Sequence, residues 1–212
     1  IEGLDEALNP YHPSKIISYL IGAFLHPKEE VRWKAIYAFG RKTALLAKED
    51  LERARIVIRR LMWMLNEESG GMGWGVGEGF AEALYHAESL KKEYLQIYVS
   101  YIWPEGNYLE FPPAQRGILW GIGRLAQKYR EDLIKISAQD YLIYHLSSKD
   151  ELVVFFSLWG LLQFKEAIGV DKALIEQALF FLKQKPFQVC FFDGRAIKTY
   201  GLEDIEGLTK NF

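Results

Sequence analysis

The residues with the clearest chemical potential lie in a glycine-rich stretch, NEESGGMGWGVGEGFAEAL, at residues 66–84. Glycine amides at the start of a helix near Val76 could hold an anion such as a phosphate. The stretch contains no G-x-G-x-x-G in any frame, follows a helix-like segment and lacks the Gly-Lys-Ser/Thr of a P-loop. Glu78 would also repel an anion. The alternative is that residues Gly70–Gly79 only allow a tight turn and close helix packing.

Acidic residues of the same stretch could form a carboxylate pair for acid–base catalysis or metal binding. They are Glu67, Glu68, Glu78 and Glu82. A structural alternative is that Glu78 offsets the helix dipole in a first turn, while Glu67 and Glu68 are a solvated helix end. A third interpretation is a salt bridge from Glu78 or Glu82 to Arg41 or Arg116 of a neighbouring helix.

Other catalytic or metal-binding patterns are weak. The four histidines are far apart in the sequence, and two of them, His12 and His26, precede a proline. The single cysteine, Cys190, cannot build a zinc site or an internal disulfide, and no histidine lies near it in the sequence. The sequence therefore predicts no cofactor, no metal site and no catalytic residue, and it favours a non-catalytic role.

Composition limits the partners. The chain has 212 residues, half of them apolar, and a formal net charge of −2. That charge gives no general attraction to nucleic acid or to an anionic membrane. No run of 18 apolar residues predicts a membrane span, and one cysteine fits a reducing cytosol. We expect a cytoplasmic protein with no membrane partner; what preceded Ile1 is not determined.

Apolar periodicity predicts a chain built almost entirely of helices. Residues 1–13 read as an irregular lead-in, and Ser14 is a candidate N-cap. Asp193-Gly194 between two β-prone runs predicts a hairpin that caps the helical part, followed by a short polar tail after Gly201; the hairpin and tail together span 187–212. The helical part, 14–186, contains expected helices at about 14–25, 29–47, 50–66, 76–87, 90–103, 112–129, 132–146, 150–167 and 171–184.

A repeat is visible in these helices. Small residues recur in one register with steps of 41, 42 and 39 residues, each followed by a large apolar residue. A small residue admits the backbone of a neighbouring helix, and a period near 40 is typical of helical-hairpin solenoids. We therefore predict an all-α superhelix of about four to five helical hairpins with a small β-hairpin cap. The small residues are Ala38, Gly79, Gly121 and Gly160, and the large ones are Phe39, Phe80, Ile122 and Leu161.

The segments VRWKAIYAFGRKTALL (31–46) and QRGILWGIGRLAQKY (115–129) carry a Gly-Arg pair at the same register, Gly40-Arg41 and Gly123-Arg124. They resemble the HEAT-like repeats of the short bacterial kind, also called PBS-lyase HEAT-like repeats. The resemblance covers about 14–184. It implies an α-α superhelix and no particular activity. The glycine-rich stretch is also similar to that of an uncharacterised bacterial HEAT-repeat family.

A second set of residues shares one face of the repeated helices, because positions i, i+4 and i+8 nearly superimpose. If this face is concave and open, it forms an aromatic and charged groove suited to a protein or peptide partner. Alternatively, the neighbouring unit or the C-terminal hairpin covers these side chains, and Trp159 on an apolar helix favours such burial. The predicted groove residues are Trp33, Tyr37, Arg41, Trp74, Glu78, Glu82, Arg116, Trp120 and Arg124.

Two other functions follow from the resemblance. Some HEAT-like proteins are alkylpurine DNA glycosylases, which use tryptophans and an acid in a basic cleft. Trp33, Trp74 and Trp120 could stack on bases, but the negative net charge makes a nucleic-acid partner unfavourable. The bilin-related HEAT-like proteins suggest instead a chromophore lyase or chaperone. The non-catalytic scaffold that binds a protein or peptide is the favoured prediction.

Overall fold

Three helices of this chain start at aspartates that accept backbone N–H groups. The computed structural model describes residues 3–67, 73–164, 167–184 and 187–210. Asp50 caps α4 (Leu51–Leu65) by accepting from the Arg53 amide at 3.1 Å. Asp150 caps α9 (Glu151–Leu162) through the Val153 amide at 2.9 Å. Asp171 caps α10 (Lys172–Leu182) in the same way.

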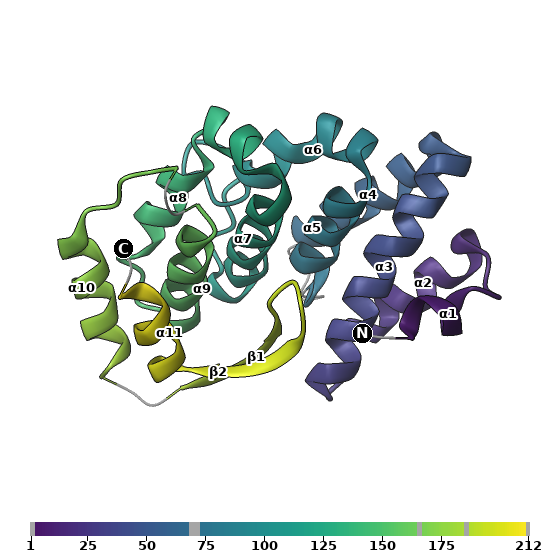
Figure 1. Ribbon diagram of the computed structural model, residues 1–212. Helices are drawn as coiled ribbons and strands as arrows, with labels where there is room; N and C mark the ends of the chain where they lie inside the picture. The colour runs from purple at the N-terminus through teal and green to yellow at the C-terminus, as the bar shows by residue number, and fades with distance from the viewer. Residues whose placement is uncertain (1–2, 68–72, 165–166, 185–186, 211–212) are drawn as a thin grey trace.

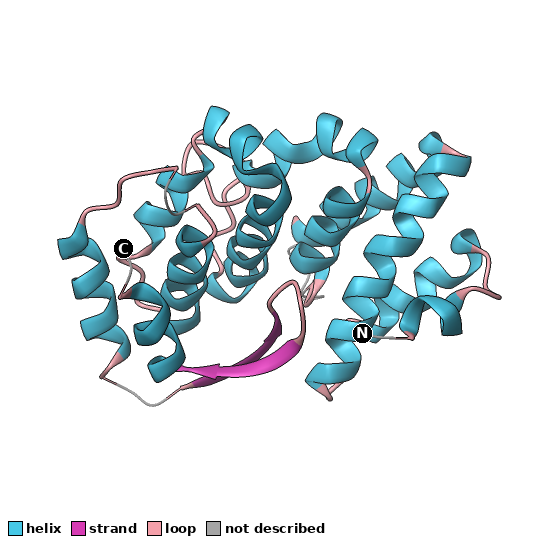
Figure 2. Ribbon diagram, in the orientation of Figure 1, coloured by secondary structure: helices cyan, strands magenta, loops and turns pink. Residues whose placement is uncertain are grey.

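The described residues are mostly helical, with one small antiparallel hairpin near the C-terminus (Figures 1 and 2). None of the helices in this part of the chain is both long and apolar enough to span a bilayer. The remaining elements are α1 (Leu4–Leu8), α2 (Pro13–Ala23), α3 (Glu29–Glu49), α5 (Val76–His86), α6 (Glu88–Ser100), α7 (Pro112–Lys135), α8 (Ala138–His145), β1 (Gln188–Phe192), β2 (Ile197–Gly201) and α11 (Leu202–Thr209).

Four helices, α3, α5, α7 and α9, stand side by side in chain order and make the most extensive helix contacts (Figure 1). We call them the inner row. The flanking helices α4, α6 and α8 each contact two members of this row, while α2 packs on α3 and α10 on α9. The core lies between the two layers, where side chains such as Phe39, Phe80 and Ile122 are fully buried.

Glycines set the spacing within the inner row. A Cβ atom on Gly40 of α3 would lie 2.5 Å from the Cβ of Glu82 on α5. One on Gly123 of α7 would lie 2.6 Å from the Trp159 ring and 2.9 Å from the Cα of Gly160 on α9. Both distances are shorter than van der Waals contact, so any side chain at these positions would push the helices apart. The two Gly-Arg pairs therefore mark close helix approaches.

The predicted register of small residues lies between the two layers. Gly79 faces the ring of Phe24, which follows α2, and Gly121 faces the hydroxyl of Tyr98 on α6. Gly160 faces Leu142 on α8, with contacts of 3.0–3.3 Å for an added Cβ. Each glycine thus accepts a large side chain from the flanking layer, and Ala38 is buried as well.

The hairpin prediction is confirmed, with a correction at its turn. β1 and β2 pair antiparallel, with Phe192 opposite Ile197 and Gln188 opposite Gly201. The Asp193 amide donates to the Ala196 carbonyl at 3.1 Å, so Gly194 and Arg195 are the central turn residues rather than Asp193 and Gly194. Gly194 has a φ of +99°, a conformation that glycine adopts without steric cost.

The two ends of the chain are more ordered than the sequence predicted. The lead-in contains α1, and the buried ammonium of Lys42 donates to the carbonyls of Leu8 (2.8 Å) and Tyr11 (3.1 Å). α2 begins at Pro13, and its cap is His12 rather than Ser14, because the His12 ring accepts the Ser14 amide. The predicted polar tail is wrong in part, since it forms the helix α11 and the side chain of Ile205 on that helix is fully buried.

The predicted end of the helix 112–129 coincides with a break at Tyr129, whereas the helix predicted at 132–146 is corrected. α7 continues to Lys135 through a kink at Tyr129, whose φ and ψ are −125° and 36°. α8 is correspondingly short and starts after Ser137, which adopts a positive φ of 57°. The apolar pattern located the first boundary at residue 129, but it did not show the second boundary at Ser137.

Candidate functional site

The hairpin lies along the inner row, and two tryptophans hold its first strand. The indole Nε1–H of Trp33 on α3 donates to the carbonyl of Cys190 at 2.9 Å. The indole of Trp120 on α7 donates to the carbonyl of Phe192, also at 2.9 Å. Residues 190 and 192 are two apart on a strand, so both carbonyls belong to the same edge of β1.

The pairing of the hairpin explains why that edge is available. In an antiparallel pair, successive residues direct their N–H and C=O groups alternately toward and away from the partner strand. The bond from the Asp193 amide to Ala196 fixes this alternation. It turns the carbonyls of Cys190 and Phe192 away from β2, toward the helices. The tryptophans therefore occupy the place that a third strand would take in a larger sheet.

A continuous stack of three tryptophans supports β1. The rings of Trp33 and Trp120 have centroids 4.7 Å apart, and Trp120 and Trp159 are parallel at 6.4 Å. Phe191 packs edge-on against Trp159 at 5.2 Å and is fully buried. The tryptophans of α3 and α7 thus meet although α5 packs between their helices. The tryptophans on this face of the inner row thus already bind the chain's own hairpin.

A buried charged cluster lies beside the stack. Glu82 on α5 accepts a hydrogen bond of 2.6 Å from Nε of Arg124 on α7. Its other oxygen lies 3.0 Å from Nε2 of His86, one turn further along α5. Burial alone would raise the pKa of the Glu82 carboxyl, but His86 and Arg124 together outweigh it, so this pKa lies below its ordinary value. Glu82 is therefore a carboxylate held inside the protein.

Arg124 also links the cluster to the hairpin. Its guanidinium lies 3.5 Å from the ring centroid of Tyr85 and 5.2 Å from that of Phe192. It donates to Gln127 at 2.8 Å, and Gln127 in turn donates to the carbonyl of Asp193 at 2.8 Å. The hairpin thus supplies part of the surroundings that keep Arg124 buried and hydrogen-bonded.

Arg116, at the start of α7, forms a bidentate pair with Asp150, the cap of α9. Its Nε donates to one carboxylate oxygen at 2.9 Å, and a terminal nitrogen donates to the other. Burial would raise the pKa of Asp150, but Arg116 and the capped amides lower it overall. Among the residues of the predicted salt bridges, Glu82 pairs with Arg124 and Arg116 pairs with Asp150.

The sequence predicted an open groove, but several of the nine predicted groove residues are buried. Four of the nine residues, Trp33, Glu82, Trp120 and Arg124, are at most 3% exposed. The alternative that the C-terminal hairpin covers them describes this arrangement. Tyr37, Glu78 and Arg116 are half-buried, and Arg41 and Trp74 are exposed. Tyr37 contacts Phe192 edge-on at 5.6 Å, so it too lies at the hairpin.

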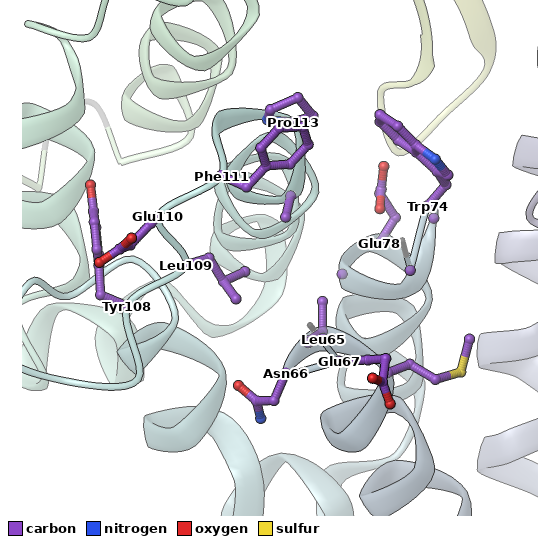
Figure 3. A pocket seen from close by; sticks show the side chains of 15 residues that line it. Leu65, Asn66, Glu67, Trp74, Glu78, Tyr108, Leu109, Glu110, Phe111 and Pro113 are labelled. Atoms are coloured by element: carbon purple, nitrogen blue, oxygen red, sulfur yellow. The ribbon is translucent and has the colours of Figure 1, made fainter. Parts of the chain in front are cut away.

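The second feature is a cavity of about 650 Å³ at the other end of α5, next to the glycine-rich stretch. Its walls come from the last turn of α4, the start of α5, the segment 108–111 and the first turn of α7. Figure 3 shows Trp74 and Glu78 on one side, and Leu109, Phe111 and Pro113 on the other. Residues 68–72, including Glu68, Gly70 and Gly71, lie outside the described residues.

The charges at this cavity test whether the glycine amides near Val76 could hold an anion. Gly75, with a φ of +74°, is the N-cap of α5, and Glu78 lies in its first turn. Burial raises the pKa of the Glu78 carboxyl, and a backbone N–H and the charge of Arg32 offset only part of that rise. Among the described residues that line the cavity, none is Lys, Arg or His. Its charge does not suit a phosphate.

The sequence analysis missed several residues that complete the site. His86 stands at i+4 from Glu82 on the same helix, a spacing that could have indicated their pairing. Asp150 was visible only as a possible helix start. Gln127 and Phe192 join the cluster solely because the hairpin folds back over α7. No local pattern predicts such a long-range contact.

Comparisons with known proteins give a relative without a described function. A protein of Archaeoglobus fulgidus, described as uncharacterized, is 32% identical over 124 residues, which is 58% of this chain. The aligned part spans 59% of that protein's own length, so this chain matches a little over half of it. No family model matches the chain. No solved structure matches it either.

Proposed function

We propose that this chain is a HEAT-like helical-repeat scaffold that binds an extended protein or peptide segment along its inner row. The proposal rests on how β1 is bound: Trp33 and Trp120 donate to backbone carbonyls two residues apart on this strand. Hydrogen bonds to the main chain recognise an extended strand with little regard to its side chains. A partner strand can therefore use the same donors.

The repeat part of the proposal is supported by the packing. Gly79, Gly121 and Gly160 each accept a large side chain from the flanking layer, and Gly40 and Gly123 mark close approaches in the inner row. Helical-hairpin repeats bury one face of each unit against the next in this manner. They commonly bind partners on the surface formed by their second helices, which here are α3, α5, α7 and α9.

The hairpin then acts as a built-in ligand that a partner must displace. Its turn is closed by Asp193, whose carboxylate accepts from the amides of Arg195 (2.7 Å) and Ala196 (2.8 Å) and from the Tyr200 hydroxyl (2.7 Å). Because the hairpin covers the inner row, only a minor fraction of the molecules can bind a partner at any time. The apparent affinity for a partner falls by the fraction of molecules in which the hairpin is open.

The test uses the full chain and a labelled peptide that copies residues 187–201, with binding followed by fluorescence anisotropy. An Asp193→Ala, Gly194→Val double variant removes the turn acceptor and places a β-branched residue at a positive φ. We expect it to bind the peptide about tenfold more tightly than the wild type, equivalent to about 1.4 kcal/mol. Lys92→Ala on α6, far from the hairpin, is the matched control.

Hydrogen exchange of β1 shows whether the hairpin has opened in the double variant. An opened hairpin without peptide binding would overturn the proposal. A DNA glycosylase gains no comparable support from the contacts, because the Trp33 and Trp120 rings are buried and Arg116 and Arg124 are each paired with a carboxylate. The scaffold remains the function that these contacts favour.

A further inference from the structure

The cavity beside the glycine-rich stretch combines negative charge with open aromatic surface. Fifteen of the described residues line it; they include the carboxylates of Glu67, Glu78 and Glu110, and none of the fifteen is basic. Trp74 and Phe111 line it while 45% and 49% exposed. Both rings therefore offer accessible aromatic surface at the cavity.

The arrangement of these groups favours one class of ligand. The faces of aromatic rings attract ammonium and guanidinium groups, and a neighbouring carboxylate adds a counter-charge. In Figure 3 the Glu78 carboxyl points up beside Trp74, and Phe111 lies on the opposite wall. Between them a cation would meet a carboxylate and two rings.

The cavity also offers apolar contacts and room for more than a small ion. Met64, Leu65, Leu109, Pro113 and Ala114 line it. Its volume of about 650 Å³ is within the range of small-molecule sites. A ligand that fills it has a hydrocarbon body as well as a charged head.

A metal ion is a poorer match to the same groups. The carboxyls of Glu67 and Glu110 lie at different corners from Glu78 and do not converge with it (Figure 3). In the described part of the chain, no three His, Cys, Asp or Glu side chains gather closely enough to hold a metal. Helix-dipole compensation explains a carboxylate in the first turn of α5, but it does not explain the exposed rings around it.

We propose that this cavity binds an organic ammonium ion, with Glu78 as its counter-ion, Trp74 and Phe111 against the charged head, and the apolar wall against its hydrocarbon part. The raised pKa of Glu78 is consistent with this role, because burial outweighs the charge of Arg32 there and a bound cation would add a second counter-charge. This inference is independent of the strand-binding proposal, since it uses a different surface and different residues.

The experiment compares three six-carbon probes that differ in charge: hexylammonium, neutral hexan-1-ol and hexanoate. Binding is followed by the indole N–H signal of Trp74 in ¹H–¹⁵N NMR spectra, assigned with a Trp74→Phe variant. We expect hexylammonium to shift the signal at about tenfold lower concentration than hexanol, and hexanoate to leave it unchanged. Glu78→Gln keeps the shape of the side chain and should weaken hexylammonium binding about tenfold while leaving hexanol binding unaltered.

Glu88→Gln, on an exposed residue at the start of α6, is the control for the loss of one surface charge. Equal binding of hexanol and hexylammonium, unchanged hexylammonium binding by Glu78→Gln, or no shift with any probe would each overturn the proposal. A further arm uses a short lysine peptide and its acetylated form. If the lysine peptide binds as well as hexylammonium and its acetylated form does not, the ammonium can belong to a protein side chain; if hexylammonium alone binds, it belongs to a free amine.

Discussion

Glu78 and Glu82 stand one turn apart on α5, and their surroundings are opposite. Glu82 is fully buried beneath the hairpin, hydrogen-bonded to Arg124 and close to His86. Glu78 is half-buried at the wall of the cavity, and burial raises its pKa, whereas the partners of Glu82 lower that of Glu82. Glu82 in its ionised form therefore stabilises the fold, whereas the ionised form of Glu78 destabilises it.

The two regions also differ in what their aromatic residues do. Under the hairpin, Trp33, Trp120 and Trp159 stack on one another, and two of them use their N–H groups on β1. At the cavity, Trp74 and Phe111 are about half exposed. A satisfied, buried set of aromatics is a structural element, and an open set beside a carboxylate is a candidate for ligand contact.

The largest expected effect comes from breaking the buried pair. Arg124→Ala leaves the Glu82 carboxylate inside the protein without its main partner, which costs about 3–5 kcal/mol of unfolding free energy. Urea denaturation followed by circular dichroism measures the change. The control is Arg53→Ala on the exposed face of α4, where the loss should stay within about 0.5 kcal/mol. A loss for Arg124→Ala no larger than the control would mean that Glu82 is not held by this pair.

A smaller effect tests the tryptophan donors of the closed face. Trp120→Phe keeps an aromatic ring but removes the N–H that binds the Phe192 carbonyl, and it should cost about 1–3 kcal/mol through the unpaired acceptor and the lost ring volume. Trp63→Phe is the matched control, because Trp63 is 65% exposed on α4. Hydrogen exchange should also become faster in β1 and remain unchanged in α4. Uniform acceleration in both would indicate general loosening instead.

The smallest effect has the opposite sign and concerns the cavity. Because the folded-state pKa of Glu78 is raised, its contribution to stability is present below the unfolded-state value of about 4.3 and is lost as the pH rises through the folded-state value. Glu78→Gln should therefore stabilise the protein by up to about 1 kcal/mol at pH 7 and by nothing near pH 3. Urea denaturation across this pH range measures the difference.

Glu82→Gln provides the contrast. The folded-state pKa of Glu82 is lowered, so its contribution is present above about pH 4.3 and is lost as the pH falls through the folded-state value. This variant should be less stable than the wild type at pH 7, and the gap should narrow in acid. If Glu78→Gln and Glu82→Gln changed the stability in the same direction at pH 7, the two carboxylates would not differ in the way proposed.

Much of the fold could be predicted from local patterns. Asp50, Asp150 and Asp171 mark helix starts through side-chain chemistry that acts within three residues. Asp193-Gly194 located the hairpin, although the central turn residues differ by one position. The boundary at Ser137 and the short helices α1 and α11 were missed, because they depend on contacts made elsewhere in the fold.

The candidate site was predicted only in part. The sequence placed Trp33, Trp120, Glu82 and Arg124 on one face, and the structure brings them together beneath the hairpin. Pairing between Arg116 and Asp150 joins residues 34 positions apart, and the bond from Trp33 to Cys190 spans 157 positions. Periodicity describes the side of a helix on which a residue lies, but it does not show what covers that side.

The amino-acid sequence by itself determined the long helices, the register of small residues and the composition of the inner row, because these follow from interactions between near neighbours along the chain. Only the tertiary structure decided that the hairpin folds over that row, that Glu82 is neutralised by Arg124 and that the Glu78 carboxyl lies at an aromatic-lined cavity. The charge state and accessibility of a side chain depend on groups brought close by packing. Those groups come from distant parts of the chain.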